Sequence, residues 1–288
     1  MIKCFKIEII TTGILLLIGL LLPIKYQNFL GGLLILSLGI LHGSNDIQII
    51  TKKNIHKNKA ITTLYYLGIV LIGGLAFFFF PTLALLSFVL FSAYHFGEQH
   101  WEFRLKKSYL SLLFYFVYGA CIFSVLFFFH RAEVQQVVKA ITSYRLPSDW
   151  FYWALTGSTS LFVILLIGLS ENRKYLIFEC LLLLAFALFF SYTSLILAFG
   201  FYFVVWHSLP SLKSQFEFLY RTTNKVQQIF SYIAESIIYW VAAIMGLAGV
   251  YLWIDFSADY FLPLFFTFLA AITFPHVLVM HWMLRDKK

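Results

Sequence analysis

Residues 77–102 read FFFFPTLALLSFVLFSAYHFGEQHWE, in which a long apolar run ends in two histidines and two carboxylates. An apolar run of about 20 residues is long enough to cross a bilayer as a helix. Ionisable side chains are costly in lipid, so they normally face the interior of a helix bundle, pair with one another or bind a ligand. The stretch therefore predicts a transmembrane helix that carries a polar site near one end.

Composition indicates the same class of protein for the whole chain. Of the 288 residues, 61% are hydrophobic, 20% are aromatic and only 12% are charged. A soluble domain typically carries about twice that charged fraction. Cys4, Cys121 and Cys180 have no paired or CxxC spacing, which gives no sign of a disulfide framework or a thiolate metal site. We therefore expect an all-α, polytopic transmembrane helical bundle.

The apolar runs and their breaks predict about ten spans. We find no internal repeat or linker, so residues 1–288 are expected to form a single integral membrane domain. Two connecting segments, 131–146 and 213–233, have apolar residues at helical spacing and are expected to lie along the membrane surface. The expected spans are 7–23, 29–49, 61–79, 82–100, 109–130, 150–170, 175–191, 193–211, 232–253 and 261–284.

Basic residues predict the orientation of these spans. With ten spans, 17 of the 21 Lys and Arg residues fall on one side of the membrane, and the other side holds Lys25, Arg131, Lys139 and Arg145. The side rich in Lys and Arg is normally cytoplasmic. We therefore expect both termini in the cytoplasm and a multi-pass protein of the inner (plasma) membrane. This topology also explains the net charge of +8, so no nucleic acid partner is expected.

Four histidines end four of the expected spans at a similar depth. All four spans run towards the cytoplasm, and each histidine precedes the next basic residue by 6–10 positions. At about 1.5 Å per residue, this places them about 9–15 Å inside the cytoplasmic charge layer. A single histidine near a helix end is commonly an interfacial residue, but four at one depth predict a shared metal or cofactor site. They are His42, His95, His207 and His276.

An all-imidazole site suits iron, copper, zinc or nickel, whereas magnesium or calcium would require more oxygen ligands. Two carboxylates follow these histidines closely, and we take them as the catalytic side chains beside the metal ligands. If the helix continues through Gly43, Asp46 shares a face with His42 and could accept its imidazole N–H. Glu98 is placed to do the same for His95, although a role as an interfacial hydrogen-bond acceptor explains it equally well.

Four motifs together resemble the Brp/Blh family of membrane β-carotene dioxygenases. The resemblance implies an Fe(II)-dependent enzyme that cleaves the central double bond of β-carotene with O2 to give two retinal molecules. It further implies a carotenoid substrate taken from the bilayer and a functional link to a rhodopsin. In chain order, the motifs are His42-Gly43-x-x-Asp46, His95-Phe96-Gly97-Glu98, Trp206-His207-Ser208-Leu209 and Pro275-His276.

One departure from the family pattern concerns the fourth metal ligand. Members of the family tend to carry a second histidine four residues after the one that matches His207, where this chain has Ser211. We expect Pro210 to end or kink the helix there. His276 has the right depth to replace the missing ligand, and His100, His281 or water are the alternatives.

Two other functions are compatible with the same residues. A membrane carrier or an electron-transfer protein could use paired histidines to hold haem or to form a proton path. An inactive homologue of the dioxygenases would also keep most of the motifs.

Overall fold

The computed structural model describes residues 6–53, 58–102, 104–105, 109–168, 174–220, 224–253 and 261–285. Within these residues the regular structure is entirely helical, which confirms the expected fold class. Among the described residues, six helices are long and apolar enough to cross a membrane, and the number of ten spans stays a prediction. Several basic residues used for the orientation, among them Lys3, Lys57 and Lys287, lie outside the described residues. The six helices are Lys59–Phe79, Leu110–Phe129, Ser148–Gly168, Leu195–Leu219, Lys225–Leu252 and Phe261–Arg285.

The chain divides into two compact units. Unit 1 comprises residues 1–35, 93–136 and 145–208, and unit 2 comprises residues 36–92, 137–144 and 209–288. Three helices contribute residues to both units: the π-helix η2 (Ile35–Gly39), α5 (Pro81–Trp101) and α7 (Arg131–Thr142). The expectation of a single domain stays a prediction.

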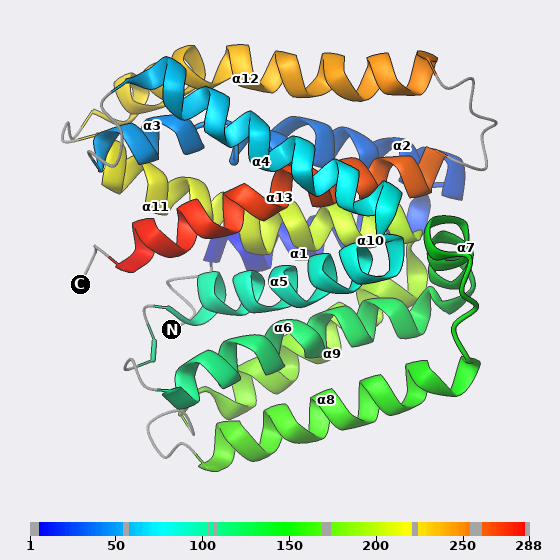
Figure 1. The fold of residues 1–288 in the computed structure, drawn as a ribbon. Coiled ribbons are helices and arrows are strands. Elements are labelled where there is room, and N and C mark those ends of the chain that lie inside the picture. Colours follow the sequence, from blue (N-terminus) through cyan, green and yellow to red (C-terminus); the bar gives the residue numbers. More distant parts are fainter. Residues whose placement is uncertain are drawn as a thin grey trace. The chain divides into compact units, whose positions relative to one another are not determined.

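In unit 1 the apolar helix α6 is the centre of the packing. It contacts α8 and α9, and α2 packs against α10 (Figure 1). Much of α6 is buried, whereas most of α8 faces outward, as expected where one helix surface meets lipid. The helices of unit 1, besides parts of α5 and α7, are α1 (Lys6–Leu21), α2 (Ile24–Leu34), α6 (Tyr109–Phe129), α8 (Ser148–Gly168), α9 (Leu176–Tyr192), α10 (Leu195–Phe201) and the π-helix η4 (Tyr202–Ser208).

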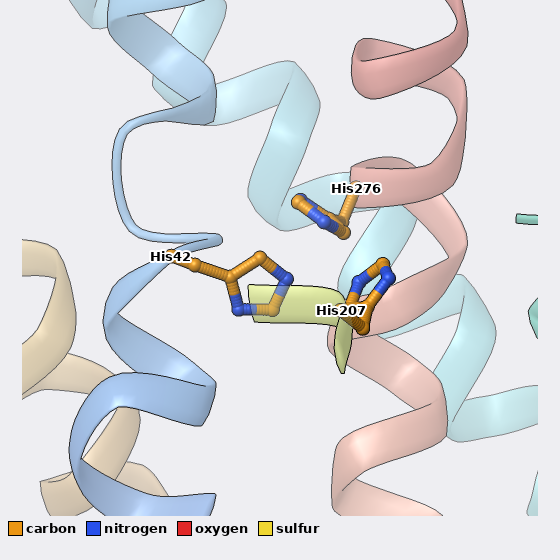
Figure 2. Close-up of side chains that lie close together, drawn as sticks. All are labelled: His42, His207 and His276. Carbon is orange, nitrogen blue, oxygen red and sulfur yellow. The ribbon is translucent and has the colours of Figure 1, made fainter. Parts of the chain in front are cut away.

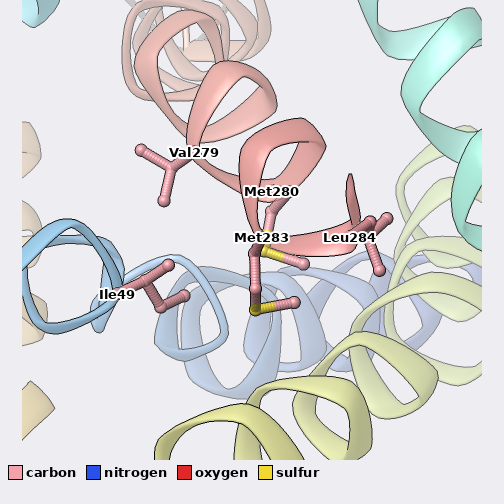
Figure 3. Close-up of a cluster of buried hydrophobic side chains, with 5 residues drawn as sticks. All are labelled: Ile49, Val279, Met280, Met283 and Leu284. Carbon is pink, nitrogen blue, oxygen red and sulfur yellow. The ribbon is translucent and has the colours of Figure 1, made fainter. Parts of the chain in front are cut away.

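In unit 2 the helix α13 packs against both α4 and α3, while α12 contacts α13 and α11 (Figure 1). Five buried side chains at the α3–α13 contact form a cluster that we call the α13 cluster (Figure 3). The cluster consists of Ile49, Val279, Met280, Met283 and Leu284. The helices of unit 2 are most of the π-helix η2 (Ile35–Gly39), α3 (Asp46–Lys52), α4 (Lys59–Phe79), α11 (Leu209–Leu219), α12 (Lys225–Trp253) and α13 (Phe261–Arg285).

The expected span 29–49 is interrupted in the structure. After η2 the chain makes a turn at residues 42–45, where Gly43 N–H bonds Ile40 O and Ser44 N–H bonds Leu41 O, and α3 begins only at Asp46. Glycine, serine and asparagine are weak helix formers because they gain alternative backbone conformations or local side-chain bonds. Ser44 Oγ indeed donates to Ile40 O at 3.1 Å. The assumption of a continuous helix through Gly43 is therefore wrong.

The expected end of the eighth span at residue 211 is also wrong, whereas a kink at Pro210 stays a prediction. Residues 195–219 form one membrane-length helix that includes η4 and α11. Pro210 is the second residue of α11, which directly follows the π-helix η4. The first turn of a helix has no need of the backbone N–H that proline lacks, so the helix continues past it.

Of the two segments expected on the membrane surface, 131–146 does contain a helix, α7, and its place at the surface stays a prediction. The segment 213–233 does not form a helix of its own. Most of its described residues belong to α11 and to the first part of α12, which begins at Lys225 and runs on to Trp253, and its place at the surface also stays a prediction.

Helices α5 and α6 approach closely at two glycines. A Cβ on Gly97 would overlap the backbone carbonyl of Tyr115, and a Cβ on Gly119 would overlap that of Ala93. Membrane helices come together through small residues of this kind, because their backbones can then touch.

We expect Gly97→Ala and Gly119→Ala to destabilise the protein, each by about 1–3 kcal/mol, because an overpacked interface must shift to admit the methyl group. Thermal unfolding in detergent measures the effect. Gly157→Ala on α8 is the control, because a Cβ there meets nothing within 4 Å. An equal loss of stability in the control would show that helix contact is not the cause.

Candidate metal site

His42 lies at the turn that interrupts the second expected span, and its side chain is buried. The Nδ1 atom is in hydrogen-bond contact with the carbonyl oxygen of Gly39, in the π-helix η2. A carbonyl only accepts hydrogen bonds, so Nδ1 must carry the proton. In the neutral ring, Nε2 then carries the lone pair that a metal ion requires.

His276 of α13 is buried and is oriented by a carboxylate. Its Nδ1 lies 3.0 Å from both Oδ1 and Oδ2 of Asp46, the first residue of α3. Asp46 is only 1% exposed and also accepts a hydrogen bond from the hydroxyl of Tyr66 at 2.8 Å. An ionised carboxylate only accepts, so Nδ1 of His276 donates and Nε2 carries the lone pair in the neutral ring.

These two histidines lie close together in unit 2 (Figure 2). Their ring centroids are 4.7 Å apart with the planes nearly perpendicular, and they offer ligand atoms within 4.8 Å of each other. Gly43 follows His42 directly, and a Cβ there would lie 3.5 Å from Nδ1 of His276. This is an ordinary van der Waals distance, so the turn at Gly43 packs against the ring of His276.

A polar network holds the backbone of the turn. Gln215 Nε2 donates to the carbonyl oxygen of His42 at 2.7 Å, and the Tyr232 hydroxyl lies 2.8 Å from Gln215 Oε1. Asn45 Nδ2 donates to the Tyr232 carbonyl at 3.1 Å, and Ser211 Oγ accepts from Gln215 Nε2 at 3.2 Å. Ser211, at the position of the missing family histidine, therefore belongs to the network that supports His42.

Unit 1 contains a second pair, His95 and His207. Both are buried, and their ring centroids are 4.7 Å apart. His207 belongs to the π-helix η4, and the ring of Phe203, one turn earlier, stacks on it with an angle of 11° between the planes. π-helical turns occur frequently at functional sites, because they re-aim side chains within a helix.

Glu98 and His100, which follow His95 on α5, have other contacts. Glu98 Oε1 accepts a hydrogen bond from the Tyr94 hydroxyl at 2.9 Å, and its suggested role in orienting His95 stays a prediction. His100 Nε2 lies 3.3 Å from both carboxylate oxygens of Glu179, which also accepts from Arg104 Nη1 at 2.5 Å. His100 thus belongs to a buried ion-pair cluster, which favours His276 over His100 as the fourth ligand.

Sequence reasoning assigned Asp46 to the wrong histidine. Because the backbone turns at residues 42–45, Asp46 bonds His276 and not His42. Sequence reasoning also missed Tyr66, Gln215 and Tyr232, which support the two histidines of unit 2. Tyrosine and glutamine within apolar helices give no signal in a single sequence, because their partners are distant along the chain.

The donors fit a transition metal. His42, His207 and His276 are buried, and each offers a ring nitrogen that could bind an ion. Neutral imidazole suits iron, copper, zinc and nickel. Asp46 accepts a hydrogen bond from Nδ1 of His276, and metal-bound histidines commonly donate their other ring N–H to a carboxylate in this way.

Comparison with known proteins agrees with this chemistry. The family model described as beta-carotene 15,15'-dioxygenase matches residues 33–284, a range that includes both histidine pairs and Asp46. Neither the curated proteins nor the solved structures gave a match. Because the family model covers most of the chain, this protein belongs to the β-carotene 15,15'-dioxygenase family.

Proposed function

We propose that this protein holds one Fe(II) ion with His42, His95, His207 and His276 and cleaves the central double bond of β-carotene with O2. Each carbon of the broken 15,15' bond takes one oxygen atom, so that one C40 chain gives two molecules of retinal. The observation that carries the proposal is the buried Asp46–His276 hydrogen bond beside His42, in a chain of the β-carotene dioxygenase family.

Two properties of the four histidines support this proposal: the tautomer of His42 and His276, and the burial of all four rings. His42 and His276 donate Nδ1–H to Gly39 O and to Asp46, which leaves the Nε2 lone pair of each neutral ring available to hold the ion. Iron bound by neutral imidazoles supplies the capacity to activate dioxygen. The burial of all four rings excludes water, which protects a reaction between an apolar polyene and O2.

The proposed substrate is apolar and dissolves in the bilayer, so it reaches the protein from the lipid. The proposed product could then serve a rhodopsin in the same inner membrane. The alternative of a haem protein would use the same histidines. The absorption spectrum of the purified protein separates the two functions, because only haem gives a Soret band.

The first prediction from the proposed function concerns metal content. We expect one iron per chain in protein purified without chelators. Each variant that removes a proposed ligand should lose iron sharply. These variants are His42→Ala, His95→Ala, His207→Ala and His276→Ala. His100→Ala and His281→Ala serve as controls and should keep the iron. Two irons per chain, or loss confined to one histidine pair, would show that the pairs do not share one ion.

The second prediction concerns the reaction. Cells that accumulate β-carotene should form retinal in an oxygen-dependent way when they express this protein. The four ligand variants should form none, because the iron is lost. Gly157→Ala, on the outward side of α8, should match the unchanged protein. Full iron content without retinal would support an inactive homologue.

A further inference from the structure

Tyr66 reaches Asp46 from a third helix. Its ring, on α4, packs against the α13 cluster of Ile49, Val279, Met280, Met283 and Leu284, and its hydroxyl donates to Asp46 Oδ2 at 2.8 Å. Among the described residues, Tyr66 and His276 supply the hydrogen bonds to this carboxylate. The ring and the hydroxyl of Tyr66 therefore have separable roles, one in packing and one in the site.

The hydroxyl bond constrains how Asp46 faces His276. A buried carboxylate is stable only when its oxygens accept hydrogen bonds, and bonds to an ionised acceptor are the stronger kind. The bond from Tyr66 fixes Oδ2, so rotation of the carboxylate away from Nδ1 of His276 would break it. Both oxygens consequently stay at 3.0 Å from that nitrogen.

We propose that Tyr66 is a positioning residue, which acts through Asp46 to hold His276 in the Nδ1–H tautomer with Nε2 directed to the metal. This inference rests on the proposed function, because it treats His276 as a metal ligand. The three residues come from α4, α3 and α13, which pack against one another in pairs, so the hydrogen bonds join the three helices at one point.

The first test measures metal affinity. Metal-free protein in detergent is titrated with Co(II) against a chelator of known affinity, and its thermal unfolding is recorded alongside. Tyr66→Phe keeps the ring and should weaken binding about tenfold, and Asp46→Asn about 10–100-fold, as is typical for residues behind a metal ligand. Tyr65→Phe is the matched control on the same helix, where Tyr65 is 61% exposed, and it should bind Co(II) like the unchanged protein.

A double variant separates positioning from a merely structural role. If Tyr66 acts through Asp46, adding Tyr66→Phe to Asp46→Asn should weaken Co(II) binding little further. Multiplied losses in the double variant would show that Tyr66 acts independently of Asp46. Unchanged Co(II) affinity in Tyr66→Phe, or weakening only in proportion to a lowered unfolding temperature, would also overturn the proposal.

A measurement without metal distinguishes this inference from the proposed function. Nitrogen-15 NMR of histidine-labelled, metal-free protein reports the tautomer of each ring, with the His276 signals assigned by their absence from His276→Gln. We expect Nδ1–H in the unchanged protein and in Tyr65→Phe, and a mixture of tautomers in Tyr66→Phe and Asp46→Asn. If the protein binds no metal but shows this pattern, the proposed function fails and the positioning role of Tyr66 stands. An Nε2–H tautomer in the unchanged protein, or no change in Tyr66→Phe, would overturn the inference.

Discussion

The hydrogen bond between the buried Asp46 carboxylate and His276 is the interaction on which the rest of unit 2 depends. A carboxylate that is 1% exposed in an apolar protein must be compensated by donors from its surroundings. Those donors come from α13 and α4, so the charge on α3 requires the three helices to meet at this point. The α13 cluster beside it supplies the apolar contact that this arrangement also needs.

Two of the four histidines lie where the helices are irregular. His42 follows the π-helix η2 and lies in a turn, and His207 lies in the π-helix η4. Irregular backbone inside a membrane is tolerated only where other groups satisfy its polar atoms. Gln215 fills this role for the carbonyl of His42, and Tyr232 holds Gln215 in place. The polar residues of unit 2 thus maintain a backbone shape that a regular helix could not offer.

Each unit contains one buried pair of histidines: His95 and His207 in unit 1, and His42 and His276 in unit 2. His42 and His276 are supported by hydrogen bonds to a backbone carbonyl and a carboxylate, whereas His95 and His207 lie among aromatic rings such as Phe96 and Phe203. Imidazole ligands with a fixed tautomer in a dry surrounding suit the chemistry of the β-carotene dioxygenase family. At and just after the end of α5, His100 and Arg104 instead form a cluster with the buried Glu179.

The sequence by itself determined the helical membrane class, the approximate bounds of most helices and the four histidines. Long apolar runs and their breaks are local properties, and a histidine near the end of such a run can be read directly. Only the tertiary structure decided that Asp46 supports His276, that Pro210 does not end its helix and that Tyr66, Gln215 and Tyr232 belong to the site. Each of these outcomes depends on a distant partner or on a backbone turn, and no local pattern encodes either. The contact between α3 and α13 brings together Asp46 and His276, which are 230 positions apart. A π-helix changes the direction in which each following side chain points.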